Sequence, residues 1–163
     1  MGVASAILTT VHSYTATQQL VDAPTKKRDL RNSRSAALNI IPASTGAAIA
    51  TTKVLTGLKN RFDGIALRVP TAVGSIVDLT FIAKRCTGIR EVNTALSEHS
   101  DPLFCTTEEP LVSSDIIGTP FVSIADLSMT RVVNGTLVKV LLWYDNGMGY
   151  TRSLIEHTRH SGI

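Results

Sequence analysis

The sequence predicts an α+β domain in which helices pack on one face of a largely antiparallel, mixed sheet. Many short segments rich in Val, Ile, Leu and Thr are typical of strands, and only a few segments are typical of helices. The two kinds do not alternate strictly, which argues against a series of βαβ units. The 163 residues fit one domain, spanning 1–163.

The first half begins with a predicted strand at residues 3–11, where small and β-branched residues dominate. A polar segment follows at 13–35 and ends at 39–42. It is longer than an ordinary connection, and loops of that length are usually functional or disordered. Ser44, Thr45 and Gly46 then precede a predicted helix at 47–58, and two further strands are expected at 65–70 and 75–84.

The second half opens with a predicted helix at 89–99, because Ile89, Val92 and Leu96 share one helical face. Four strands are then expected, and the chain closes with a predicted helix. The strands are at 111–116, 122–129, 131–133 and 137–144, and the helix is at 150–160.

Composition narrows the classes of function. A net charge of +3 and a pI near 9.1 are weaker than a dedicated nucleic-acid binder needs, although they suit small anionic ligands. No apolar run reaches membrane-spanning length, and the start lacks the basic region of a signal peptide. Cys86 and Cys105 lack metal-ligand spacing and are expected as reduced thiols in a cytoplasmic protein.

Two features near strand and helix ends could carry chemistry. His12 follows a predicted strand, where an imidazole could act as a general base or lower the pKa of a thiol. A structural histidine is the commoner alternative. Ser44-Thr45-Gly46 begins a helix whose free N–H groups favour an anion such as phosphate, but the same residues also suit an ordinary N-cap.

Positive charge is concentrated in the polar segment. The cluster could be a solvated loop, a nucleic-acid patch or a site for a phosphorylated substrate; it consists of Lys26, Lys27, Arg28, Arg31 and Arg34. Nucleic acid ranks lowest, because Asp29 interrupts the cluster and no aromatic residue is interleaved. Arg68 lies inside an apolar strand, where it must either form an ion pair or face a ligand.

Taken together and in order, these segments resemble the C-terminal catalytic domain of phosphorylating glyceraldehyde-3-phosphate dehydrogenases. The resemblance runs from about residue 3 to residue 157. It is carried by Thr-Thr-Val-His-Ser-Tyr-Thr-Ala-Thr-Gln at 9–18, Asn-Ile-Ile-Pro-Ala-Ser-Thr-Gly-Ala-Ala at 39–48, Arg-Val-Pro at 68–70, Val-Asp-Leu-Thr at 77–80 and Trp-Tyr-Asp-Asn at 143–146. The histidine segment fits this enzyme better than its relative, erythrose-4-phosphate dehydrogenase.

The resemblance implies a reaction and a role for each matched residue. In the family a cysteine thiolate attacks the aldehyde of glyceraldehyde 3-phosphate, hydride passes to NAD, and inorganic phosphate releases the acyl group as 1,3-bisphosphoglycerate. By motif, His12 would be the catalytic base; Thr15, Thr17 and Arg68 would bind the substrate phosphate; Thr45, Gly46 and Arg31 would bind inorganic phosphate; and Asn146 and Tyr150 would contact the nicotinamide.

The sequence also departs from the family pattern. The cysteine motif lies upstream of the matched region, and neither Cys86 nor Cys105 falls at a matching position. A Gly-rich dinucleotide fingerprint, the mark of the N-terminal Rossmann domain, is likewise missing. Gly147 and Met148 replace the usual acidic and aromatic residues, while Pro24 favours NAD over NADP. We therefore expect a chain that is inactive alone and forms a homo-oligomer, or alternatively a non-catalytic oligomerisation or interaction fragment.

Overall fold

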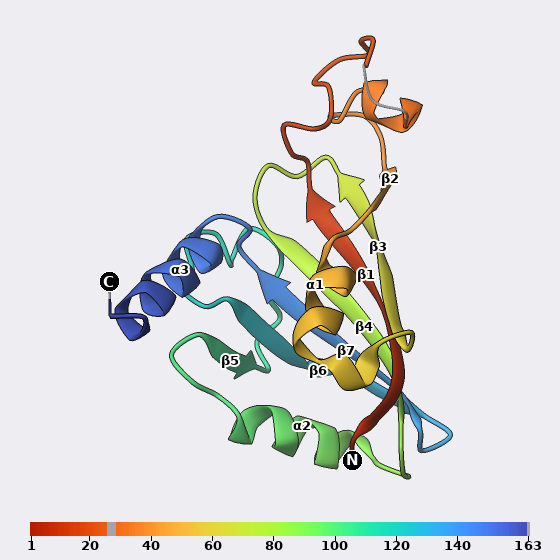
Figure 1. Ribbon diagram of the computed structural model, residues 1–163, viewed down its shortest axis with the longest axis vertical. Coiled ribbons are helices and arrows are strands. Elements are labelled where there is room, and N and C mark those ends of the chain that lie inside the picture. Colours follow the sequence, from red (N-terminus) through yellow and green to blue (C-terminus); the bar gives the residue numbers. More distant parts are fainter. Residues whose placement is uncertain (26–28, 163) are drawn as a thin grey trace.

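The computed structural model of the protein describes residues 1–25 and 29–162. It contains a seven-stranded sheet with the order β2-β3-β1-β4-β7-β6-β5 (Figure 1). The pairs β1–β3 and β5–β6 are parallel, and the other four are antiparallel. The strands are β1 (Val3–Ser13), β2 (Ile41–Ser44), β3 (Phe62–Val69), β4 (Ser75–Ala83), β5 (Phe104–Thr107), β6 (Ser123–Val133) and β7 (Leu137–Tyr144).

Two helices cover the same face of this sheet, as the sequence predicts. Leu8, Leu79 and Val140 are neighbours across β1, β4 and β7, so their side chains share one face. Helix α1 (Ala47–Val54) packs against β3 at one end of this face. Helix α2 (Ile89–Glu98) places Val92 on a core of β4 and β7 side chains at the other end. The predicted α+β class with helices on one face is confirmed.

The opposite face of the sheet, here called the outer face, is covered by no helix of the described residues (Figure 1). Apolar side chains are exposed on this face. Four exposed members are Ile7, Ile65, Ile82 and Leu137. An ion pair between Lys139 and Asp78 crosses β7 and β4 among them.

Residues 14–25 and 29–40 lie beyond the sheet after β1, and we call these two stretches the projecting loop (Figure 1). Its two arms are joined by a bridge between Gln19 and Ser35. Asp22 strengthens this contact because it accepts a 2.7 Å hydrogen bond from the Ser35 N–H and pairs with Arg34. A short 3-10 helix, η1 (Leu30–Ser33), lies within the loop.

The strand predicted at 111–116 is wrong, because turns occupy this stretch. Asp115 accepts a 2.7 Å hydrogen bond from the Val112 N–H, and the Asp115 N–H returns to the Val112 carbonyl. A side chain that satisfies its own backbone competes with strand pairing. The strand on this side of the sheet is the short β5, which the sequence did not indicate.

Smaller differences concern element ends. The strands predicted at 122–129 and 131–133 are the single strand β6, whose register with β7 shifts between Asp126 and Arg131. The helix predicted at 47–58 ends at Val54 and is followed by a 3-10 turn, η2 (Thr56–Leu58). The last helix, α3 (Met148–His160), begins two residues earlier than predicted and lies beside the sheet.

Candidate functional site

A cavity of about 390 Å³ opens on the helix-covered face, near the ends of β1 and β3. It gathers three of the predicted site residues, His12, Thr45 and Arg68. The remaining lining residues are Leu8, Thr10, Ala47, Val77, Val122, Ser123, Leu142 and Tyr144. No carboxylate is among the described residues that line it, so the charge of Arg68 is not neutralised within the cavity.

His12 and Arg68 are direct neighbours in the parallel pair of β1 and β3. Nδ1 of His12 donates a 2.6 Å hydrogen bond to the Ser13 carbonyl, which leaves Nε2 as the basic nitrogen. Burial lowers the pKa of His12; the hydrogen bond with Ser13 raises it in part, and the nearby Arg68 charge lowers it further. A neutral imidazole with one free lone pair is the form that a general base requires.

Arg68 is only partly satisfied by the protein. Its Nη1 donates a 3.4 Å hydrogen bond to the Ser13 carbonyl, whereas its buried Nε has no partner among the described residues. Burial lowers the pKa of Arg68, and the guanidinium still remains charged at neutral pH. A buried donor without a partner costs free energy unless a ligand completes it, and a guanidinium fork suits phosphate oxygens.

Tyr144 and Thr10 also line the cavity, and the sequence motifs did not mark either residue as functional. Their hydroxyl groups are 2.7 Å apart. The Tyr144 ring meets the His12 imidazole edge to face, with centroids 5.8 Å apart. Alternation along β1 could have indicated that Thr10 and His12 share a face, but the contact with Tyr144 comes from β7.

The first turn of α1 closes one side of the cavity. Thr45 lines the cavity and accepts a 3.2 Å hydrogen bond from the Ala47 N–H. Gly46 is exposed, and a Cβ atom placed on it would meet no atom within 4 Å. Packing within the described chain therefore does not require glycine here, and the space before the helix start is open to a ligand.

Asn146 lies in the turn after β7. Its Oδ1 accepts a 3.1 Å hydrogen bond from the hydroxyl of Ser13, the residue that follows His12. Asp145 is buried beside Asn146 and holds the start of α3, because it accepts hydrogen bonds from the N–H groups of Gly147 and Met148. Tyr150, on the first turn of α3, is 67% exposed and does not line the cavity.

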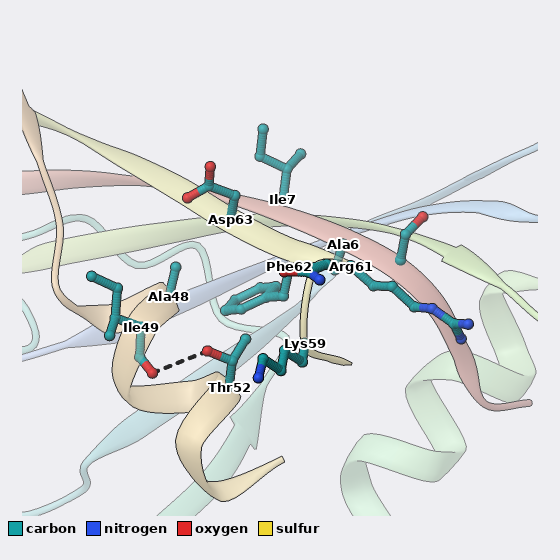
Figure 2. A pocket seen from close by; sticks show the side chains of 11 residues that line it. Ala6, Ile7, Ala48, Ile49, Thr52, Lys59, Arg61, Phe62 and Asp63 are labelled. Carbon is teal, nitrogen blue, oxygen red and sulfur yellow. Dashed lines mark hydrogen bonds between the residues drawn. The ribbon is translucent and has the colours of Figure 1, made fainter. Parts of the chain in front are cut away.

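A larger cavity of about 560 Å³ lies between α1 and the opposite ends of β1 and β3 (Figure 2). Phe62 and Ile49 contribute apolar surface, and the charged side chains of Lys59, Arg61 and Asp63 also line the cavity. None of the predicted site residues lines it. Size alone therefore does not identify the site in this fold.

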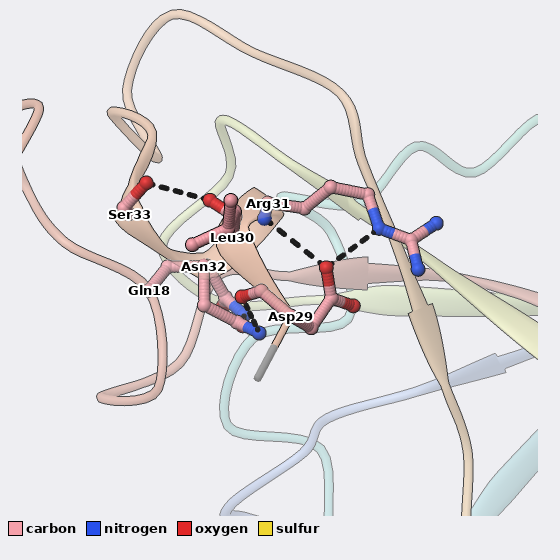
Figure 3. A network of polar contacts seen from close by, with 6 residues as sticks. All are labelled: Gln18, Asp29, Leu30, Arg31, Asn32 and Ser33. Atoms are coloured by element: carbon pink, nitrogen blue, oxygen red, sulfur yellow. Dashed lines mark hydrogen bonds and ion pairs between the residues drawn. The ribbon is translucent and has the colours of Figure 1, made fainter. Parts of the chain in front are cut away.

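The projecting loop holds the other predicted phosphate ligands outside the cavity. The hydroxyls of Thr15 and Thr17 lie 2.9 Å apart, so these two side chains form a pair. Arg31 is exposed and donates from Nε to Asp29 at 2.8 Å (Figure 3). The structure does not bring Arg31 to His12. Of the basic cluster, Lys26, Lys27 and Arg28 lie outside the described residues.

Neither cysteine reaches the cavity. Cys86 is exposed near Gly135, and Cys105 lies on β5, where burial raises the pKa of its thiol. Residues 1–25 and 29–162 contain no group of three or more His, Cys, Asp and Glu side chains arranged for a metal ion. Within the same part of the chain, every helix is too short or too polar to cross a membrane.

Comparison with a family model and with curated proteins points to one and the same family. Residues 1–146 match the family model described as "Glyceraldehyde 3-phosphate dehydrogenase, C-terminal domain". Similar curated proteins include the glyceraldehyde-3-phosphate dehydrogenase of Clostridium acetobutylicum, 43% identical over 95% of this chain and 47% of that protein. Glyceraldehyde-3-phosphate dehydrogenase 1 of Streptomyces avermitilis is 47% identical over 96% of this chain and 47% of its own length. The chain thus spans about half the length of these relatives.

Proposed function

This chain belongs to the glyceraldehyde-3-phosphate dehydrogenase family, and we propose that it is the catalytic domain that supplies the base and the phosphate-binding groups. The substrate would be glyceraldehyde 3-phosphate, oxidised with NAD and phosphorylated to 1,3-bisphosphoglycerate. The observation that carries the proposal is the pairing of a neutral His12 with a partly unsatisfied Arg68 in one cavity. A base and an anion-binding group are thus adjacent.

The phosphate groups would bind on two sides of His12. Arg68, whose Nε has no partner in the described part of the chain, would hold the substrate phosphate, and the paired hydroxyls of Thr15 and Thr17 would approach from the projecting loop. The open start of α1 at Thr45 and Gly46 would receive inorganic phosphate. Arg31 would join it only after leaving Asp29, because that pair occupies its Nε.

Bound NAD would supply the hydride acceptor. Asn146 fits the nicotinamide end, because its side chain is exposed at the turn after β7 and is held by Ser13. Tyr150 would pack near the same ring from α3. The chain has no Gly-rich dinucleotide fingerprint. Asn146 and Tyr150 would therefore contact only the nicotinamide, and other residues would have to bind the pyrophosphate and the adenosine of NAD.

We propose further that residues 1–163 do not turn over substrate by themselves. The reaction needs a thiolate beside the base, and Cys86 and Cys105 both lie away from the His12 cavity. Burial also raises the pKa of Cys105, which disfavours its thiolate.

The test is NADH formation at 340 nm with glyceraldehyde 3-phosphate, NAD and phosphate. The purified chain should give no signal alone and should give one when mixed with the half of the Clostridium acetobutylicum relative that it does not match. His12→Asn should reduce that signal by about 10²–10⁴-fold. His99→Asn, an exposed histidine outside the cavity, is the matched control. Turnover by the chain alone would contradict the proposal of inactivity.

A second candidate role, subunit association, is favoured by the outer face of the sheet. Apolar side chains are exposed there on adjacent strands, with Ile7 at 56%. A second copy of the chain is the occupant that we propose, and the projecting loop adds exposed Leu20 and Leu38.

Sedimentation velocity over a wide concentration range tests this role. Ile7→Lys should weaken association, because it places a charge on the apolar face. Ile117→Lys is the matched control, since Ile117 is 55% exposed and lies in the turns after β5. A chain that is monomeric at every concentration would exclude the association.

A further inference from the structure

Ser13 occupies the centre of the polar contacts around His12. It is the last residue of β1 and is fully buried. Its N–H donates a 3.1 Å hydrogen bond to the Ser75 hydroxyl. Its carbonyl accepts from Nδ1 of His12 at 2.6 Å and from Nη1 of Arg68 at 3.4 Å. Each main-chain polar group of Ser13 therefore has a partner at the site.

The Ser13 hydroxyl lies 3.4 Å from Nδ1 of His12, and it also contacts a residue beyond β7. The hydroxyl donates to Oδ1 of Asn146 at 3.1 Å, which connects the end of β1 with the turn after β7. Asn146 is otherwise an exposed side chain, and an exposed amide is free to rotate about its χ angles. A donor that is itself buried restricts that rotation and occupies the amide oxygen, which leaves the Nδ2 amino group to donate outward.

We propose that Ser13 is the positioning residue of this site, setting the tautomer of His12 through its carbonyl and the orientation of the Asn146 amide through its hydroxyl. The proposal rests on the proposed function for the roles of His12 and Asn146. Because a carbonyl can only accept, neutral His12 must carry its proton on Nδ1 and present Nε2 to the cavity. Because Oδ1 is occupied, Asn146 offers a donor, which suits the carbonyl oxygen of a ligand carboxamide.

A purely structural serine would behave differently. Buried hydroxyl groups are usually hydrogen-bonded, so a partner alone would not indicate a positioning role. The positioning role predicts a separation of effects. Loss of the hydroxyl should release the Asn146 amide and leave the tautomer of His12 unchanged, because the 2.6 Å hydrogen bond from Nδ1 to the Ser13 carbonyl remains when the longer 3.4 Å contact with the hydroxyl is lost. A structural role would instead lower stability and disturb both side chains together.

The experiment uses NMR on the whole chain with ¹⁵N-labelled Asn and His. In Ser13→Ala, the order parameter of the Asn146 side-chain amide should fall from about 0.8 to below about 0.6. The Nδ1-protonated tautomer and the titration midpoint of His12 should stay as in the unmodified protein. Ser13→Cys keeps the shape with a weaker donor and should give an intermediate order parameter.

Thr130→Val is the matched control, because Thr130 is also buried and its hydroxyl has no partner within the described residues. It should leave the Asn146 amide and His12 unchanged. An unchanged Asn146 order parameter in Ser13→Ala would overturn the proposal, and so would a neutral His12 protonated on Nε2.

A ligand titration separates this inference from the proposed function. Oxidised nicotinamide mononucleotide should shift the Asn146 side-chain resonances, with at least a threefold weaker midpoint in Ser13→Ala. Equal midpoints in the two proteins would contradict the positioning role. If the mononucleotide shifts nothing while Ser13→Ala still frees the amide, the assignment of Asn146 to the cofactor is wrong and the positioning role stands.

Discussion

The hydroxyl of Tyr144 lies 2.7 Å from that of Thr10, and this contact joins β7 to β1 two residues before His12. Thr10 is 5% exposed, so its hydroxyl depends on this partner. The same contact holds the Tyr144 ring against the His12 imidazole. Strands that are separated in the sequence by more than a hundred residues thereby contribute adjacent side chains to the site.

Tyr144→Phe should destabilise the fold by about 1–2 kcal/mol, because it leaves the buried Thr10 hydroxyl unpaired. Thr10→Val in the same protein should recover part of this loss, since neither hydroxyl then remains. Urea unfolding of the two single variants and the double variant measures the coupling. Additive losses would mean that the two hydroxyls do not interact.

The titration of His12 should reflect its surroundings. Burial and the neighbouring Arg68 charge together place its pKa below the ordinary value of 6.5. Arg68→Met removes the charge and should raise the midpoint seen by NMR. Arg68→Lys, which keeps the charge, should change it less. A midpoint at or above 6.5 in the unmodified protein would contradict this description of the cavity.

The same shift should appear in the pH dependence of stability. The unfolded chain takes up a proton on His12 near pH 6.5, whereas the folded chain keeps the imidazole neutral to a lower pH. His12 therefore makes the fold less stable as the pH falls from about 6.5 to the lowered pKa. Urea unfolding of the unmodified chain and of His12→Gln at pH 7.5 and 5.5 should show a steeper loss in the former. Equal slopes would exclude this linkage.

Asp145 should stabilise α3 through its charge. Burial raises its pKa, but hydrogen bonds from the N–H groups of Gly118, Met148 and Gly147 outweigh this effect and leave the pKa below the ordinary 3.8. Asp145→Ala should cost about 1.5–3 kcal/mol at pH 7 by urea unfolding.

The advantage of Asp145 over Asn should be complete above pH 3.8 and should disappear as the pH falls through the lowered pKa of the folded state. Asp145→Asn is therefore the control that isolates the charge. A difference between Asp and Asn that stays constant from pH 6 to pH 2.5 would show that the charge contributes nothing.

The central strands were predictable because their apolar and β-branched residues run without Gly or Pro, as in β4 and β7. The short β5 was not, because Phe104–Thr107 is stabilised by parallel pairing with β6, and no local pattern specifies such a partner. At 111–116 the apolar residues suggested a strand, and the local hydrogen bonds of Asp115 formed turns instead.

Local sequence patterns also failed to reveal the long-range contacts of the candidate site. Sequence motifs found His12, Thr45 and Arg68, which the fold brings to one cavity. They could not show that Asp29, two residues before Arg31, holds that side chain in the projecting loop. Ser13 was not identified as a positioning residue either, because its contacts with Arg68, Ser75 and Asn146 span 55, 62 and 133 residues.

Gly74, which precedes β4, connects the backbone of this strand to the site. Its φ of +89° lies in the left-handed region, and a Cβ atom there would approach the Ser113 carbonyl oxygen to 2.3 Å. Gly74→Ala should therefore cost about 2–4 kcal/mol in urea unfolding, from backbone strain and the displaced carbonyl together. Gly57→Ala is the control, because its Cβ would meet open space, and it should change stability by less than about 0.5 kcal/mol.

The neighbouring Ser75 hydroxyl supports the Ser13 N–H, so displacement of residue 74 should also reach the site. In Gly74→Ala, the His12 resonances should shift even under conditions where the protein is fully folded, because the carbonyl that orients His12 belongs to Ser13. In Gly57→Ala they should not. A Gly74→Ala protein with unaltered His12 resonances would show that the β4 start and the site are mechanically independent, and the support given by Ser75 would then be dispensable.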